Sequence, residues 1–228
     1  MTDDDTRCYE MLLRVRQLGT DEAATIASNT FVTDLFNSLS QVITGLETHA
    51  NQQSSGLTTA RQSTRSMTVA RDELERDLAA ISRTARSISQ SIPGLEEKFR
   101  FTHDHKNQEL LTASHLFAAD ALPLKTEFIK RGLPANFLDN LNDDINAFEE
   151  ALARRTQGTT AHVNATAAID DLVERGVKIV RELNLIMRNI FDDNHGKLAA
   201  WLSASHIERA PRRSTAKTQP APPPTPSA

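Results

Sequence analysis

The chain has 228 residues, of which 39% are hydrophobic, and its 30 acidic residues against 26 lysines and arginines give a net charge of −4. This length is enough to bury a sizeable core. The single cysteine, Cys8, cannot form an internal disulfide, which excludes a secreted disulfide scaffold.

The composition also bears on location. No run approaches the roughly 20 apolar residues that a membrane span needs. The first residues are acidic, whereas a signal peptide starts with basic and then apolar residues. We therefore expect a cytoplasmic protein without a membrane segment. The net negative charge argues against binding of nucleic acid over the whole surface.

Apolar residues recur at spacings of three and four along almost the whole chain, which predicts an all-α protein. A first helix is expected over residues 4–17, where Cys8, Met11 and Val15 form an apolar stripe, and Gly19 is placed to end it. Between residues 20 and 33 we expect at most a short helical turn, around residues 22–27.

The second predicted helix is long. Its three-four repeat starts at Phe36, ends at Ile92 and keeps its phase across Ser54-Ser55-Gly56. A continuous phase predicts one helix of about 60 residues, which Pro93-Gly94 ends.

Residues 95–105 form a predicted connector. A third helix is expected over residues 106–130, kinked or split by Pro123, which lacks the N–H that a helix interior requires. A turn at residues 132–134 follows.

The fourth predicted helix repeats the long pattern from Leu138 to Ile190 and ends within residues 192–196. A short final helix carries Leu198, Trp201 and Leu202. Pro, Ala, Ser and Thr dominate the rest, which predicts a disordered tail.

These lengths predict an elongated antiparallel bundle of two long helices, each of about 60 residues, with shorter helices packed on them. The polar middles of the long helices, residues 51–68 and 156–166, would face each other. The connector would return to the middle, so that the third helix lies beside one half, and the first helix and the Trp201 segment would cover the other half. We expect a single domain over residues 1–206 and the tail over residues 207–228. A break in either polar middle would instead give a compact bundle of shorter helices.

No catalytic residue, metal site or cofactor is expected. His103-Asp104-His105 offers two histidines, and a metal site needs three or four ligands. The Glu-x-x-His motif of di-metal bundles is absent, and the glycines are too isolated to form a phosphate-binding loop.

The polar middle could hold a small ligand or a metal. Its contacts would come from four residues at inward positions: Gln53, Arg155, Thr159 and His162. The simpler interpretation is a hydrated layer that fixes the register of the helices at some cost in stability.

The C-terminal segment is a candidate docking element for a protein or an acidic polymer. It combines the only tryptophan, Trp201, with the basic residues Arg209, Arg212 and Arg213. In the alternative interpretation, Trp201 caps the end of the bundle and the cations keep the tail soluble.

Three short strings carry a resemblance. The ending Ala200-Trp201-x-Ser203-Ala204-Ser205-His206-Ile207-Glu208-Arg209-Ala210-Pro211, together with segments 45–50 and 93–100, resembles a family of uncharacterised bacterial all-helical proteins. The resemblance implies a bacterial origin and a helical fold, and it supplies no activity or site residue.

The sequence thus favours a non-enzymatic helical scaffold or protein-binding protein, whose partner is another protein or a second copy. This rests on the long amphipathic helices and on the absence of a catalytic motif. The alternative is the ligand-binding bundle with its site at the polar middle.

Overall fold

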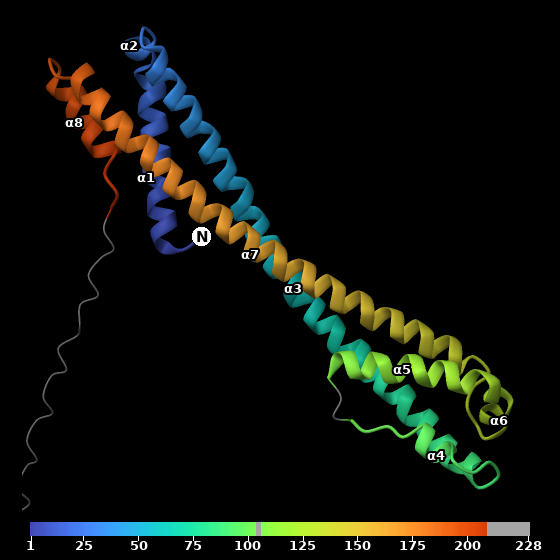
Figure 1. Ribbon diagram of the computed structural model, residues 1–228. Coiled ribbons are helices and arrows are strands. Elements are labelled where there is room, and N and C mark those ends of the chain that lie inside the picture. The colour runs from blue at the N-terminus through green and yellow to red at the C-terminus, as the bar shows by residue number, and fades with distance from the viewer. Residues whose placement is uncertain (104–105, 209–228) are drawn as a thin grey trace, which may run out of the picture. The chain divides into compact units, whose positions relative to one another are not determined.

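The computed structural model describes residues 1–103 and 106–208. Helices make up the fold, and no strand occurs in these ranges, which confirms the all-α prediction. In chain order (Figure 1), the elements are α1 (Asp3–Asp21), α2 (Ala23–Ile26), α3 (Thr30–Ser89), α4 (Leu95–Lys98), α5 (Asn107–Ala121), the 3-10 turn η1 (Leu122–Leu124), α6 (Lys125–Lys130), α7 (Phe137–Ile190) and α8 (His195–Ala204).

The two long helices form without a break. α3 has 60 residues and α7 has 54, so both polar middles are helical, as the uninterrupted phase of the apolar repeat predicts. α3 starts six residues before the expected Phe36, at Thr30. After α3, Gly94 adopts φ 89°, a left-handed conformation that reverses the chain.

The predicted third helix is split at Pro123, as expected. α5 ends at Ala121, Pro123 lies in η1, and α6 resumes at Lys125. The predicted connector is not wholly irregular, because the one-turn helix α4 forms directly after Gly94. Leu95 and Phe99 are buried at its two ends, so apolar burial stabilises this turn.

The chain divides into two compact units. Unit 2 comprises Thr44–Leu172, and unit 1 comprises Met1–Ile43 together with the described residues from Val173 onward. Each long helix contributes to both units. The prediction of a single domain over residues 1–206 stays a prediction, and most of the predicted tail lies outside the described residues.

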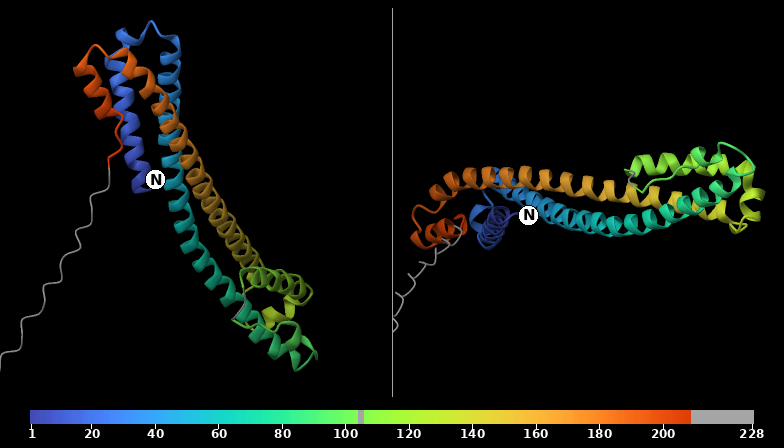
Figure 2. Two further views of the ribbon diagram at one scale, coloured as in Figure 1. Left: turned by 60° about the vertical axis from the view of Figure 1, so that its left-hand side comes forward. Right: turned by 90° about the horizontal axis from the view of Figure 1, so that it is seen from below.

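In unit 2, α3 and α7 run antiparallel and α5 packs on them (Figure 2). Asn107, at the start of α5, hydrogen-bonds Arg71 and Met67 in the middle of α3, so the connector returns to the middle as predicted. The core contains a cluster of aromatic rings. Phe99 makes edge contacts with Phe117 and Phe128, at centroid distances of 5.2 and 5.4 Å.

In unit 1, α1 and α8 pack beside the ends of α3 and α7, which confirms the predicted place of the first helix and of the Trp201 segment. Gly176 makes room for Leu12, since a Cβ built on Gly176 would lie 2.6 Å from Leu12 Cδ1. Trp201 is fully buried, and its indole Nε1 donates to Asn184 Oδ1 at 3.0 Å.

None of the helices in residues 1–103 and 106–208 combines the length and the apolar character that crossing a bilayer requires.

Replacing Trp201 with Ala should lower the free energy of unfolding by about 3–5 kcal/mol, because it opens a large cavity and removes one of the two donors to Asn184 Oδ1, the other being Arg188 Nε. Denaturant unfolding followed by far-UV circular dichroism measures this. The neighbouring Leu202, which is 41% exposed, is the matched control. A Leu202→Ala variant as unstable as Trp201→Ala would contradict the role assigned to the indole.

Candidate functional site

A loop of hydrogen bonds joins the polar middles of α3 and α7. Gln53 Nε2 donates to Thr166 Oγ1 at 2.8 Å, and Thr166 Oγ1 donates to the backbone oxygen of His162 at 2.9 Å. His162 Nδ1 lies 3.0 Å from the backbone oxygen of Gln53. Because a carbonyl oxygen only accepts, Nδ1 carries the proton. These side chains therefore link the two helices and fix their register.

The structure brings together two of the four residues predicted for a ligand site. Gln53 and His162 are partly buried and hydrogen-bonded across the helix pair. Arg155 and Thr159 are exposed, and the Thr159 hydroxyl donates to the backbone oxygen of Arg155 in its own helix. This arrangement fits a layer that fixes the register of the helices better than it fits a cavity lined by all four predicted residues.

Beside this layer, the backbones of α3 and α7 approach closely at two glycines. A Cβ built on Gly158 would lie 2.7 Å from the backbone nitrogen of Ala60, and one built on Gly56 would lie 2.9 Å from the backbone oxygen of Gly158. Real Cβ atoms do not approach backbone atoms this closely, so only glycine fits either position. This contact was not predicted from the sequence, although small residues four apart, as at Gly56 and Ala60, are a known signal for close helix pairs.

A groove runs along one face of the α3–α7 pair in unit 2. It consists of two hollows of about 520 and 800 Å³ that share Thr59. Its lining residues recur on each helix at spacings of three and four, as one helix face requires. They are His49, Gln52, Ser55, Gly56, Thr59, Gln62, Ser63, Arg65, Ser66, Val69, Ala70 and Glu73 of α3, and Ala147, Glu150, Ala151, Arg154, Gln157, Gly158, Ala161, Asn164 and Ala165 of α7.

The floor of the groove contains a hydroxyl group without a protein partner. Ser63 is 5% exposed and forms no hydrogen bond within the described residues. Over the same residues, no fully buried side-chain nitrogen or oxygen lacks a partner, so the Ser63 hydroxyl must stay accessible from the groove. On the rim, Val69 is 57% exposed.

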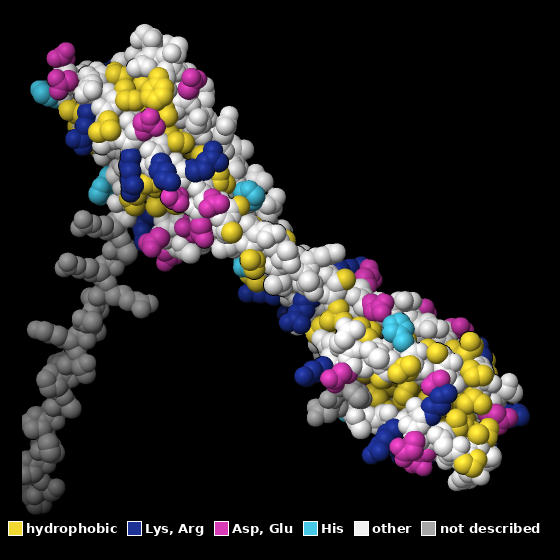
Figure 3. Space-filling view, in the orientation of Figure 1, with side chains coloured by type: hydrophobic (Ala, Val, Ile, Leu, Met, Phe, Trp, Pro, Cys, Tyr) yellow, Lys and Arg dark blue, Asp and Glu magenta, His cyan; other side chains and the backbone are white. Residues whose placement is uncertain are grey.

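Most of the residues that line the groove have polar or charged side chains. On the face of unit 2 that Figure 3 shows, hydrophobic side chains gather around α5. Leu116 of α5 and Leu122 of η1 are 58% and 65% exposed. Val69 is therefore an exposed apolar side chain surrounded by small and charged residues.

The charges on α3 are ordered along the groove. Arg65 lies toward the glycine contact, and Glu73, at the acidic end of the groove, lies farther from it. On α7, Glu150 is eight residues from Gly158 and therefore lies nearer the level of Arg65 than that of Glu73. Arg154 pairs with Glu150 in its own helix. Arg65 and Glu73 form no hydrogen bond or ion pair with any described residue.

Next to the acidic end, two carboxyl groups from facing helices repel each other. Burial, and then the charge of Asp144, raises the pKa of Asp77 from its ordinary 3.8 to about 6, and Glu73 adds to this effect. Burial and the charge of Glu73 also raise the pKa of Asp144. The charge of Arg76 acts in the opposite direction on the pKa of both carboxyl groups and only partly offsets these effects.

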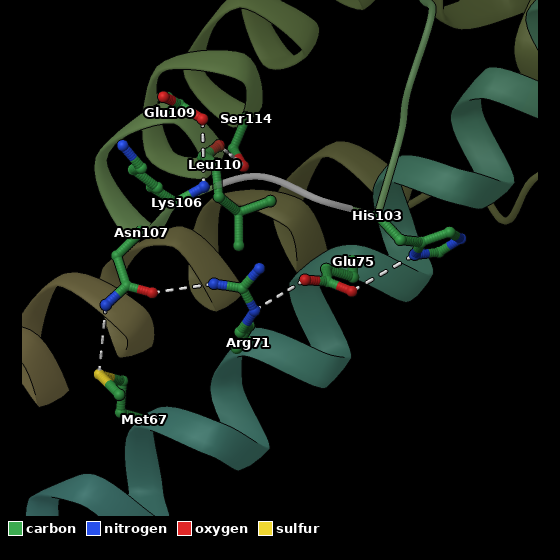
Figure 4. A network of polar contacts seen from close by, with 9 residues as sticks. All are labelled: Met67, Arg71, Glu75, His103, Lys106, Asn107, Glu109, Leu110 and Ser114. Carbon is green, nitrogen blue, oxygen red and sulfur yellow. Dashed lines mark hydrogen bonds and ion pairs between the residues drawn. The ribbon is translucent and has the colours of Figure 1, made fainter.

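A polar network fixes the start of α5 (Figure 4). Arg71 Nη1 donates to Asn107 Oδ1 at 2.9 Å, and Arg71 Nε lies 2.8 Å from Glu75 Oε1. His103 Nδ1 lies 3.3 Å from the other oxygen of Glu75. Arg71 and Glu75 are mostly buried, so this network serves to attach the connector and α5 to α3.

The histidines at the connector are not assembled into a metal site. His103 faces Glu75, while Asp104 and His105 lie outside the described residues. Within the described part of the chain, no three side chains of His, Cys, Asp or Glu are grouped so that they could hold a metal ion.

The docking element predicted at the C-terminus is described only in part. Trp201 lies in the core of unit 1, as in the interpretation that it caps the end of the bundle, and Leu202 beside it lines an open hollow of about 480 Å³. Arg209, Arg212 and Arg213 lie outside the described residues, so their role in docking stays a prediction.

Replacing Gly158 with Ala should destabilise the protein by about 1–3 kcal/mol, because the new methyl group meets the backbone of Ala60 and forces the helices apart. This reverses the gain of about 1 kcal/mol expected from helix propensity alone. Gly196 is the control, since a Cβ there would lie 3.5 Å from its nearest neighbour, Asn194 Oδ1. Urea unfolding should show Gly196→Ala neutral or stabilising, and an equal gain in both variants would contradict the close contact.

Replacing Asp77 with Asn should stabilise the protein at neutral pH. Because the pKa of Asp77 is raised, the folded state binds a proton between about pH 4 and pH 6 that the unfolded state has lost, so the wild type loses stability as the pH rises through this interval. The Asn variant lacks this loss, and its advantage should grow by about 1–2 kcal/mol from pH 4 to pH 7, allowing for solvent screening. Urea unfolding across this range measures it, with Asp72→Asn as the exposed control. An advantage independent of pH would contradict the prediction.

Comparisons of this chain with protein-family models, with curated protein sequences and with solved structures found no match.

Proposed function

We propose that this chain is a non-enzymatic helical scaffold that binds a protein partner along the groove of α3 and α7. The observation that carries the proposal is the groove itself. It extends over two hollows that share Thr59, its lining has the spacing of a helix face, and among the described residues only α3 and α7 contribute to that lining. A helical partner would meet a floor of small side chains, which permits a close approach.

Unit 2 itself supports this mode of binding, because α5 already docks on the same helix pair. α5 buries Leu110 and Phe117 in the shared core and attaches its first residues through Arg71. A third helix is therefore compatible with the α3–α7 pair, and a helix lying in a groove is a common mode of recognition between proteins.

The ligand-binding alternative has less support. The Gln53 amide and the His162 ring are engaged with the facing helix, while Arg155 and Thr159 are exposed on the surface. Composition and the bacterial resemblance add that the scaffold acts in a bacterial cytoplasm, with another protein or a second copy as its partner.

The experiment places a photo-crosslinking amino acid at Ser66, which lines the groove, in the full chain within cells that naturally express it. Thr64 is the matched control, because it is exposed and lies about 200° around the same helix, at about 100° per residue. We expect Ser66 to yield a defined crosslinked protein, identified by mass spectrometry, and Thr64 to yield none.

A further substitution tests the surface rather than the crosslinker. Val69→Asp places a charge on the rim and should abolish the crosslink from Ser66, with an unchanged circular dichroism spectrum. No crosslink from Ser66, or identical products from Ser66 and Thr64, would overturn the proposed function.

A further inference from the structure

We infer that the partner in the groove is a second copy of this chain, bound antiparallel about a two-fold axis that passes near Val69 of α3. The inference rests on the proposed function, since it names the partner of the same surface. It follows from the order of side chains on α3, from the charge along the groove and from the open hydroxyl of Ser63.

The charge of the side chains on α3 changes from positive to negative on passing Val69. Arg65 lies four residues before Val69 and Glu73 four residues after it, so both are one turn away on the same ridge of the helix. If a second copy crosses antiparallel at Val69, each arginine faces a carboxylate of the other copy. The same surface is then complementary to itself, as an interface with two-fold symmetry requires.

The charge order on α3 also sets the direction of the second copy. An antiparallel copy brings Arg65 over Glu73, whereas a parallel copy in the same register brings like charges together. On the α7 rim, Arg154 and Glu150 pair within their own helix and do not distinguish the two directions.

Within one copy, the two charges on α3 are not neutralised by ion pairs. Arg65 and Glu73 have no ion-pair partner among the described residues. Glu73, Asp77 and Asp144 repel one another, which contributes to the raised pKa of Asp77. Arginines of a second copy over this acidic end would relieve the repulsion.

The shape of the groove suits the same arrangement. Val69 is 57% exposed, and beside it the floor consists of small side chains, with Ser66 and Ala70 on α3 and Ala147 and Ala151 on α7. In a two-fold complex, Val69 of each copy lies over the small side chains of the other. The Ser63 hydroxyl, which has no partner within the described residues, then lies beneath the other copy, where a polar side chain can reach it.

Charge reversal gives the sharpest test. Arg65→Glu places two carboxylates on α3, and Glu73→Arg places two guanidinium groups there, so each variant alone meets like charge across the two-fold axis. We expect the wild type to sediment as a dimer at roughly 100 μM, a concentration suited to a small interface. In each variant the dissociation constant of the dimer should rise by about tenfold or more. An equimolar mixture of the two variants should restore the dimer, because every pair across the axis is then opposite in charge.

Crosslinking tests the position of the axis. In a Cys8→Ser background, Val69→Cys should form a disulfide-linked dimer on mild oxidation, since residues at the axis approach to within about 6 Å. Thr64→Cys, on the other side of α3, should stay monomeric.

The outcomes separate the inference from the proposed function. Three results would overturn the antiparallel second copy. The first is a wild type that stays monomeric, and the second is a mixture of the two monomeric variants that fails to dimerise. The third is equal crosslinking of cysteines at positions 64 and 69. If the photo-crosslinker at Ser66 then captures a different protein, the proposed function stands and only the identity of the partner is wrong. If it captures nothing, both fail.

Discussion

The contact between Gly56 and Gly158 is the constraint on which the α3–α7 pair of unit 2 depends. The two backbones are so close that a methyl group on either glycine would collide with the facing helix. Close backbones bring Gln53 within reach of Thr166 and His162, and the resulting hydrogen bonds fix the register. The same approach leaves no room for large side chains between the helices, so the groove beside the contact has a floor of small residues.

The inward side chains of α3 are larger where more helices pack against it. Where α5 covers the pair, the inward positions are large and apolar, as at Leu74, Leu78 and Ile81. Where unit 2 has only two helices, the corresponding positions are Gly56 and Ser63. Two helices alone cannot shield a large apolar side chain from water, and small residues let them gain dispersion contacts between their backbones instead.

The sequence predicted the helices well because periodicity reports which face of a helix is buried. The unbroken phase gave the continuity of α3 and α7, and the missing N–H of Pro123 gave the split after α5. Periodicity does not report how close two helices come, so the glycine contact and the groove were missed. The exposure of Arg155 and Thr159 has the same cause, because both lie near the inward stripe but not at the line of closest approach. α4 was missed because a single turn is too short to show a period, and its stability comes from the burial of Leu95 and Phe99.

The arrangement of charge on α3 is hard to explain by the stability of one copy. Arg71 and Glu75 show how the helix neutralises charge on its own, by pairing residues four apart. Between Arg65 and Glu73, the position four residues from both is Val69, an exposed apolar side chain. A charged residue there could pair with one of the two within the helix. Valine leaves both unpaired and places an exposed apolar side chain between them. Such a choice is understandable if Arg65, Val69 and Glu73 together form a surface whose complement lies on another molecule.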